Sequence, residues 1–256
     1  MHELARQVEI TELLEPYRRL DRRAGPGGWV LANMVAGLDG STAIAGRVGE
    51  LSSPTDAELF RALRSVADAV LVGAQTVRGE QYGPVRLPDE LRAEREAAGH
   101  RPVPALAVVT RSLQLDWDAP AFAEADPASP TIIVTCEAAD RERLAEAKDQ
   151  GPVIVAGGER VDPATALEEL AGHGIEVVLC EGGPTLLGEL LAADLLDELC
   201  LTLAPLAGGD PLPVAVYPAG DRALVRFRLA HVLQDEASLF LRYERASRNE
   251  GPDGRR

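Results

Sequence analysis

The chain has 256 residues, and its 41 acidic and 26 basic side chains give a formal net charge of −15 at pH 7. Hydrophobic residues make up 46% of the sequence and charged residues 26%, proportions that are typical of globular proteins and exclude a wholly disordered chain. The negative charge disfavours a nucleic-acid partner, and no apolar run approaches the roughly 18–20 residues that span a bilayer.

The first 27 residues are predicted to form an arm outside the main domain. A charged helical stretch from Leu4 to Leu20 is followed by the helix-breaking sequence Gly25-Pro26-Gly27-Gly28. The beginning of the chain is acidic and amphipathic and lacks the apolar segment of an export signal, so we expect a cytoplasmic protein with no membrane partner. Residues 28–245 follow as one domain, and the polar residues 246–256 are predicted to be a disordered tail.

Nine short apolar runs within the domain predict β-strands. They lie at residues 29–35, 69–73, 105–110, 131–135, 152–156, 176–180, 198–206, 223–233 and 237–244. The middle runs are apolar on both faces, which is typical of a mostly parallel sheet covered by helices on both sides. The last two runs alternate in polarity and are joined by Gln234-Asp235-Glu236, so they predict a C-terminal β-hairpin.

Helix starts are marked by capping residues between these runs. Ser53-Pro54 and Asp162-Pro163 each place a capping side chain before a proline that suits the first helical position. Gly183-Pro184 opens another apolar helical segment, and the charged residues 87–99 predict a surface helix. The sequence therefore predicts an α/β fold of three layers, with helices on both faces of a central mixed sheet.

Glycine-containing turns after three of the predicted strands are the candidate ligand-binding segments. They are Glu181–Thr185, Val72–Arg78 and Ala36–Ser41. Ligands of open α/β sheets bind beyond the carboxyl ends of the strands. Glycines there let the main chain approach a phosphate closely, and free N–H groups at helix starts donate hydrogen bonds to it. The six-residue dinucleotide fingerprint is missing, so plain strand-to-helix turns are the alternative interpretation. The three cysteines and four histidines have no ligand spacing, so no metal site is expected.

The order of several short segments resembles the pyrimidine reductase family of riboflavin biosynthesis. These segments are Leu-Asp-Gly at 38–40, Leu-Arg at 63–64, Asp-Ala-Val-Leu-Val-Gly-Ala-x-Thr-Val at 68–77, Glu-Gly-Gly-Pro-Thr-Leu at 181–186, Asp-Glu-Leu at 197–199 and Ala-Pro-Leu-x-Gly-Gly at 204–209. The resemblance covers residues 28–245 and is to the reductase domain of the bacterial bifunctional deaminase–reductase. It implies a dihydrofolate-reductase-like fold, NADPH as hydride donor, a homodimer and a ribosylaminopyrimidine phosphate as substrate.

The resemblance also implies which residues hold each ligand. Arg64 and Arg86 match positions that grip the substrate phosphate, Glu181 matches an acid that faces the substrate, and Asp39 is a weaker candidate for handling a proton. Asp-Gly is also a strong turn signal, so a purely turn-forming Asp39 is the alternative. The positions that match the cofactor site are Ala36, Gly73, Thr76, Arg111, Gly182, Gly183, Pro184 and Thr185, with Arg111 placed to meet the 2′-phosphate of NADPH.

The chain departs from the family pattern on the substrate side. Asn33 stands where bifunctional members often carry Lys, Val48 and Glu50 replace Ser and Trp, and Glu80-Gln81-Tyr82 replaces an Asp followed by Asp-Pro. Two alternatives to a phosphoribosylaminopyrimidine reductase therefore stay open. One is a dihydrofolate- or pterin-type reductase on the same fold. Such a site typically has a buried acid on the first helix, and Asp56 and Glu58 lie too early in the sequence to be assigned to it. The other is a non-catalytic NADPH-binding module.

Overall fold

The computed structural model describes residues 15–17, 28–220 and 224–246. The predicted arm and tail therefore lie almost entirely outside the described residues. One piece of the arm, Glu15–Tyr17, forms the short 3-10 helix η1, and the Tyr17 side chain is fully buried against the domain. Within these residues, no helix has both the length and the apolar character that crossing a membrane requires.

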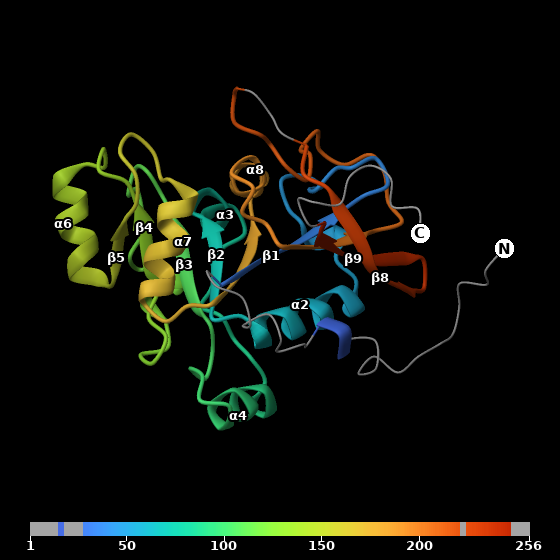
Figure 1. Cartoon of the computed structure of the whole chain (residues 1–256), viewed down its shortest axis with the longest axis horizontal. Coiled ribbons are helices and arrows are strands. Elements are labelled where there is room, and N and C mark those ends of the chain that lie inside the picture. The colour runs from blue at the N-terminus through green and yellow to red at the C-terminus, as the bar shows by residue number, and fades with distance from the viewer. Residues whose placement is uncertain (1–14, 18–27, 221–223, 247–256) are drawn as a thin grey trace.

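One nine-stranded sheet organises the molecule, with the strand order β5-β4-β3-β2-β6-β1-β7-β9-β8 (Figure 1). Strands β5 to β7 along this order pair in parallel, and the hairpin of β8 and β9 is added antiparallel to β7. All nine predicted strands are present. Their bounds are β1 Trp29–Ala36, β2 Ala69–Gly73, β3 Ala105–Val109, β4 Ile132–Thr135, β5 Val153–Val155, β6 Val177–Gly182, β7 Glu198–Leu203, β8 Phe227–Asp235 and β9 Ser238–Arg245.

Helices cover both faces of this sheet, so the predicted three-layer arrangement is confirmed (Figure 1). Buried side chains of α7 and α8 form one core with the sheet, and those of α2, α3 and η1 form a second core on the opposite face. The helices are α2 Pro54–Val66, α3 Ala74–Gly79, α4 Asp89–Ala97, α5 Pro120–Ala123, α6 Arg141–Gln150, α7 Pro163–Gly172 and α8 Pro184–Ala192, with the 3-10 helix η3 at Gly49–Leu51.

The predicted helix caps are confirmed at atomic detail. The Ser53 hydroxyl accepts a hydrogen bond from the Asp56 N–H at 3.1 Å, and the Asp162 carboxylate accepts one from the Thr165 N–H at 2.8 Å. Gly183 caps α8 with a backbone φ of 62° and no side-chain hydrogen bond. Helix α6, which was not predicted, begins at a further capping acid, Asp140.

Replacing Asp162 by alanine is expected to lower the free energy of unfolding by about 1 kcal/mol, because α7 loses its N-cap. The hydrogen bonds from Thr165 hold the pKa of Asp162 below its ordinary value of 3.8. A carboxyl group whose pKa is lower in the folded state stabilises at neutral pH, and this stabilisation is lost as the pH falls through the folded pKa. Urea unfolding at pH 7 and pH 3 measures both effects, and exposed Glu168→Ala on the same helix is the control. An equal loss at both pH values would contradict the assignment.

Candidate active site

The carboxyl ends of three central strands bring the predicted cofactor segments together. Strand β6 lies between β2 and β1, and Val72 pairs with Gly182 across the first of these contacts (Figure 1). Gly73 ends β2, Gly182 ends β6 and Ala36 ends β1. Because parallel strands end at the same edge of a sheet, these three positions lie on neighbouring strand ends, where ligands of α/β sheets bind.

Thr76 lies directly against the glycine turn that follows β6. A Cβ atom at Gly182 would lie 3.1 Å from Thr76 Cγ2, and one at Gly183 would lie 3.0 Å from Thr76 Oγ1. Gly183 also has a φ of 62°, a conformation that side chains other than glycine rarely adopt. A side chain at either position would press against Thr76. The two glycines therefore let Thr76 lie against the main chain of this turn.

The start of α8 supplies the donors that such a ligand would need. Helices α2, α6 and α7 are capped by the side chains of Ser53, Asp140 and Asp162, whereas the cap of α8 is Gly183, which has no side chain to offer. The first N–H groups of any helix have no intrahelical partner, and the helix dipole favours negative charge beside them. The turn from Gly182 to Thr185 therefore fits an anionic group such as a pyrophosphate.

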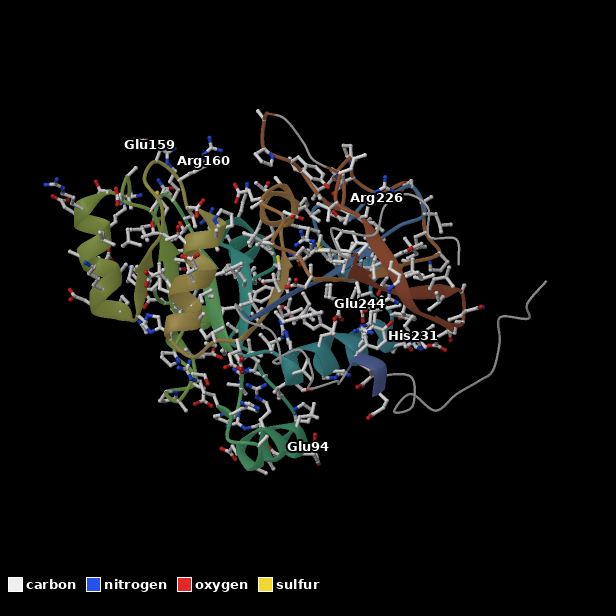
Figure 2. The ribbon with its side chains drawn as sticks, viewed as in Figure 1. Glu94, Glu159, Arg160, Arg226, His231 and Glu244 are labelled. Atoms are coloured by element: carbon white, nitrogen blue, oxygen red, sulfur yellow. The ribbon has the colours of Figure 1, made fainter. Side chains whose placement is uncertain are left out.

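Arg111 lies farther along the same edge of the sheet, two residues after the end of β3. Its guanidinium is 3.8 Å from the Glu159 carboxylate, and both side chains are exposed, at 66% and 91%. Figure 2 labels Glu159 and its neighbour Arg160 on the loop that follows β5. An ion pair this exposed is weak, so the Arg111 guanidinium can contact an anionic ligand without a large penalty.

A buried ion pair joins Arg64 of α2 to Glu181 of β6. Arg64 Nε and Nη2 donate to the two Glu181 carboxylate oxygens, each at 2.7 Å, and the side chains are 14% and 1% exposed. Arg64 Nη2 also donates to the Tyr82 hydroxyl at 2.9 Å, and that hydroxyl donates to Glu181. The Arg64 guanidinium stacks on the Phe60 ring, 4.0 Å from its centroid. The three polar side chains therefore form one closed network.

The charge states of this network follow from burial and from the contact with Glu181. Burial raises the pKa of Tyr82 well above its ordinary value, and the neighbouring Glu181 carboxylate raises it further. Tyr82 therefore stays protonated and keeps its hydrogen bond to Glu181. Burial alone would lower the pKa of Arg64, but the attraction of Glu181 outweighs it and keeps the pKa above the ordinary value. The network is an ion pair supported by a neutral phenol.

The two predicted phosphate-binding arginines have separate surroundings in this structure. Arg86 pairs with Glu124 at 2.5 Å, and its side chain is 73% exposed. Arg64 is committed to Glu181 through Nε and Nη2, while its Nη1 makes no hydrogen bond within the described part of the chain. One nitrogen of Arg64 therefore stays available, and Arg86 is held only by a solvated ion pair.

Asp39 forms the turn after β1. Its carboxylate accepts hydrogen bonds from the Ser41 hydroxyl at 2.6 Å, the Ser41 N–H at 3.1 Å and the Gly208 N–H at 2.6 Å. The Ser41 hydroxyl and then the Gly208 N–H hold the pKa of Asp39 well below its ordinary range. These contacts support the turn-forming alternative, in which Asp39 ties the loop after β1 to the loop after β7. Its part in handling a proton stays a prediction.

Several buried polar residues near the site carried no prediction of a role. Asp56 of α2 accepts hydrogen bonds from the Thr202 hydroxyl of β7 at 2.6 Å and from the Ser52 hydroxyl at 2.5 Å. Asn33 of β1 is 8% exposed, and its Oδ1 has no hydrogen-bond partner. Asp56 joins α2 to β7, and Asn33 lies on the neighbouring strand β1. Only the strand order brings them there, and no local signal in the sequence reveals it.

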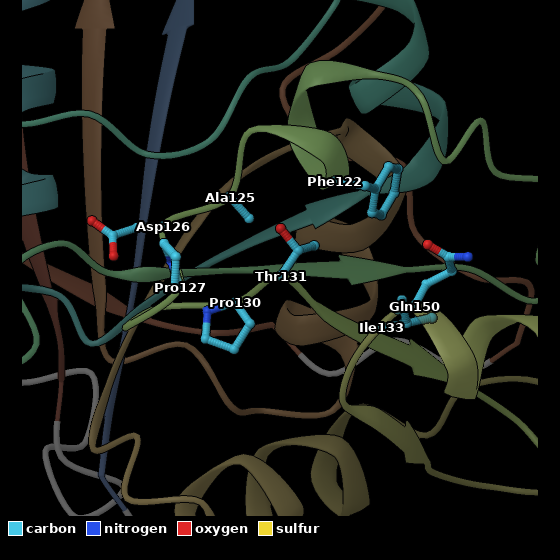
Figure 3. A pocket seen from close by; sticks show the side chains of 8 residues that line it. All are labelled: Phe122, Ala125, Asp126, Pro127, Pro130, Thr131, Ile133 and Gln150. Atoms are coloured by element: carbon cyan, nitrogen blue, oxygen red, sulfur yellow. The ribbon is translucent and has the colours of Figure 1, made fainter.

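The pocket shown in Figure 3 lies away from these residues. It has a volume of about 190 Å³ and is lined by residues that include Phe122, Pro130, Thr131 and Gln150. Thr131 immediately precedes β4, so this pocket is at the amino end of that strand, whereas the candidate site is at carboxyl ends. In the described ranges, no group of three or more acidic, histidine or cysteine side chains could hold a metal ion.

A family model, curated relatives and solved structures all relate this chain to the same group of proteins. Residues 28–241 match the family model described as the RibD C-terminal domain. The 2,5-diamino-6-ribosylamino-4(3H)-pyrimidinone 5′-phosphate reductase of Methanothermobacter thermautotrophicus is 34% identical over 181 residues, which cover 71% of this chain and 79% of the relative. The reductase of the same name from Aquifex aeolicus is also 34% identical, and the alignment covers 68% of this chain and 75% of the relative.

Solved structures of related reductases share the fold of this chain. A pyrimidine reductase-like protein from Corynebacterium diphtheriae superposes with a TM-score of 0.82 at 27% identity, covering 93% of this chain and 99% of the other. The Saccharomyces riboflavin biosynthesis reductase Rib7 superposes with a TM-score of 0.68 at 18% identity, covering 93% of this chain and 100% of the other, and it supports the fold alone. The chain therefore belongs to the RibD C-terminal domain family, the pyrimidine reductases of riboflavin biosynthesis.

Proposed function

We propose that this chain is an NADPH-dependent reductase of a phosphoribosylaminopyrimidine. The observation that carries the proposal is the adjacency of two features at the end of β6. Glu181 of the buried ion pair is followed directly by the Gly182-Gly183 turn, which lies against Thr76. A substrate held at Glu181 and a cofactor held at the turn would thus be neighbours, which is the first requirement for hydride transfer.

The residues of the turn fit a dinucleotide cofactor. The uncapped start of α8 suits its pyrophosphate, Gly73 and Ala36 end the flanking strands, and exposed Arg111 suits the 2′-phosphate that distinguishes NADPH from NADH. When bound, the cofactor supplies a hydride to C1′ of the ring-opened imine of the ribosylamine, whose nitrogen takes up a proton to give the ribitylamine.

The residues on the substrate side would bind the substrate and orient it for hydride transfer. Among the described residues, Glu181 Oε1 accepts one hydrogen bond, from Arg64, so it has the capacity to accept another from a substrate. Because the side chain is only 1% exposed, the network would have to open for that contact to form. Arg64 Nη1, which donates no hydrogen bond within the described residues, would contact the substrate phosphate, and Arg86 would leave Glu124 to join it. Holding the phosphate fixes the sugar, and hydride transfer needs its two carbons within roughly 3–3.5 Å.

A dihydrofolate- or pterin-type reductase is the second candidate, and Asp56 is the observation that favours it. Asp56 is a buried acid on α2, the first long helix of the domain, although it lies in the first turn of that helix, earlier than such a site would place it. Its two oxygens, however, already accept hydrogen bonds from the Ser52 and Thr202 hydroxyls. Because both oxygens are already used, a dihydrofolate- or pterin-type reductase is the weaker of the two candidates.

The homodimer and the cytoplasmic location remain predictions.

A side-by-side assay of NADPH oxidation tests these alternatives. We expect turnover of a phosphoribosylaminopyrimidine, supplied either as the 2,5-diamino compound or as the deaminated uracil, and much weaker turnover with NADH. Dihydrofolate is the third substrate in the panel. Turnover of dihydrofolate alone would select the second candidate. Tight NADPH binding without turnover of any of the three would select a non-catalytic NADPH-binding module.

A further inference from the structure

Tyr82 joins the buried ion pair from a loop that belongs to neither of the paired residues. Its hydroxyl donates a hydrogen bond to Glu181 Oε2 and accepts one from Arg64 Nη2 at 2.9 Å. The family pattern has proline at this position, so the hydroxyl is a feature of this chain. Proline offers an ion pair neither a donor nor an acceptor, whereas tyrosine offers both. Tyr82 is therefore a candidate for setting the geometry of the pair.

The loop that carries Tyr82 is held in place by hydrogen bonds to the elements around it. The Tyr82 N–H donates to the Val77 carbonyl of α3 at 2.9 Å, and the Glu80 carboxylate accepts from the Val48 N–H at 3.2 Å. Gln81 has a φ of 50°, a left-handed conformation that a residue with a side chain keeps only where its surroundings fix it. The phenol therefore reaches the ion pair from a fixed backbone.

The Tyr82 hydroxyl determines which atoms of the Arg64 guanidinium remain for a ligand. Nε donates to Glu181, and the two hydrogens of Nη2 go to Glu181 and to Tyr82. The hydrogens of Nη1 have no acceptor among the described residues. The Phe60 ring lies against the guanidinium, 4.0 Å from ring centroid to Cζ. Arg64 is 14% exposed and Glu181 1%, so a ligand arriving from solvent meets Arg64 first.

We propose that Tyr82 is a positioning residue that aims Nη1 of Arg64 at the substrate phosphate. The inference rests on the proposed function, in which Arg64 binds that phosphate. With the hydroxyl in place, Nε and Nη2 are both fixed, and only Nη1 points to a ligand. Without it, the guanidinium would be free to pivot on its bonds to Glu181, and binding the phosphate would have to order it first. Tyr82 thus pre-organises the phosphate contact.

The variant Tyr82→Phe tests this inference, because it removes the hydroxyl and keeps the ring. We expect kcat/KM for the phosphorylated substrate to fall about tenfold, mainly through KM, since one hydrogen bond to a charged group is lost. For the same ribosylaminopyrimidine without its phosphate, kcat/KM should stay within about twofold, because Arg64 has no phosphate to bind there. The NADPH dissociation constant should stay the same. A merely structural role would lower both kcat/KM values alike, and that result would overturn the proposal.

Tyr243→Phe is the matched control. Tyr82 packs against the core on the α2 face, whereas Tyr243 of β9 pairs with Leu199, which packs against the core on the α8 face. Paired residues of neighbouring strands share a face of the sheet, so this variant removes a phenolic hydroxyl from the other side. It should change kcat/KM for neither substrate. If Tyr82→Phe does not fold, Tyr82→His replaces it, because imidazole keeps a ring with a donor and an acceptor at a shorter reach. The same selective loss is expected.

Calorimetric titration with ribose 5-phosphate measures the phosphate contact without turnover. We expect Tyr82→Phe to bind this probe about tenfold more weakly than the wild-type protein, and Tyr243→Phe to bind it equally well. Equal affinity of Tyr82→Phe and the wild-type protein, or no binding by either, would refute the role of Tyr82. Weaker binding by Tyr82→Phe, together with no turnover of any pyrimidine by the wild-type protein, would refute only the reductase proposal.

Discussion

Replacing Arg64 by alanine is expected to lower kcat/KM for the phosphorylated pyrimidine by at least about 30-fold, or about 2 kcal/mol. The variant removes the cation proposed to contact the substrate phosphate and also leaves the 1%-exposed Glu181 carboxylate without its counter-ion. Breaking a buried pair in this way is strongly destabilising. We expect the free energy of unfolding to fall by about 3 kcal/mol, the lower end of the usual range, because Arg64 keeps some exposure. Steady-state kinetics and urea unfolding measure the two losses.

Three further variants separate the roles of Arg64. Arg64→Lys should recover part of the activity, because an ammonium is a point charge and cannot reproduce the two bonds of the guanidinium fork. Combining Arg64→Ala with Glu181→Gln should recover stability without activity, since no buried charge remains unpaired. Arg61→Ala on the same helix removes an exposed pair with Glu58 and should change stability by less than about 1 kcal/mol. Full activity of Arg64→Ala would contradict the assignment.

Replacing Gly183 by valine is expected to weaken NADPH binding by an order of magnitude or more. Gly183 has a φ of 62°, and a Cβ atom there would lie 3.0 Å from Thr76 Oγ1, so a valine would strain the turn proposed to bind the pyrophosphate and push it away from Thr76. Each lost charge-assisted hydrogen bond to the anion is worth roughly 1.5–3 kcal/mol. Fluorescence titration with NADPH measures the change.

The backbone strain of a β-branched residue at positive φ must be separated from this loss of binding. Gly174 provides the matched control, because its φ is 76° and no atom lies within 4 Å of a Cβ built there. It precedes β6 and is therefore at the opposite edge of the sheet. Gly174→Val should lose stability through the same strain but bind NADPH normally. Equal NADPH affinity of the two variants would argue against the turn as the cofactor site.

The strands were predictable because each has a local signal, whereas the partners of the site residues were not. Apolar runs bounded by turn residues identify all nine strands, and short-range caps identify the starts of α2 and α7. Helix α6 was missed although it begins at a capping aspartate, because its polar sequence buries only Ala147 and shows little apolar periodicity. Local signals thus identify elements that bury a clear apolar stripe.

The candidate site shows where sequence reasoning stops. The glycine turn and Thr76 were predicted through the family resemblance, and the structure places them in contact. The pairing of Arg64 with Glu181 spans 117 residues of sequence, and Tyr82 joins them from a third segment. Such contacts depend on β6 lying between β2 and β1, an order that no local pattern encodes. Asn33 was recognised as a departure from the family, but its unpaired oxygen is visible only in three dimensions.

Because β1 lies between β6 and β7, the centre of the sheet cannot form during synthesis until both of these later strands have been made. About 140 residues separate the end of β1 at Ala36 from the start of β6 at Val177. At the usual rate of translation, the ribosome needs on the order of 10 s to make that length of chain. Throughout this interval the apolar segment Trp29–Ala36 has no strand partner, so it is open to mispairing with other chains. Nascent chains of this protein should therefore depend on chaperones until β6 and β7 have emerged.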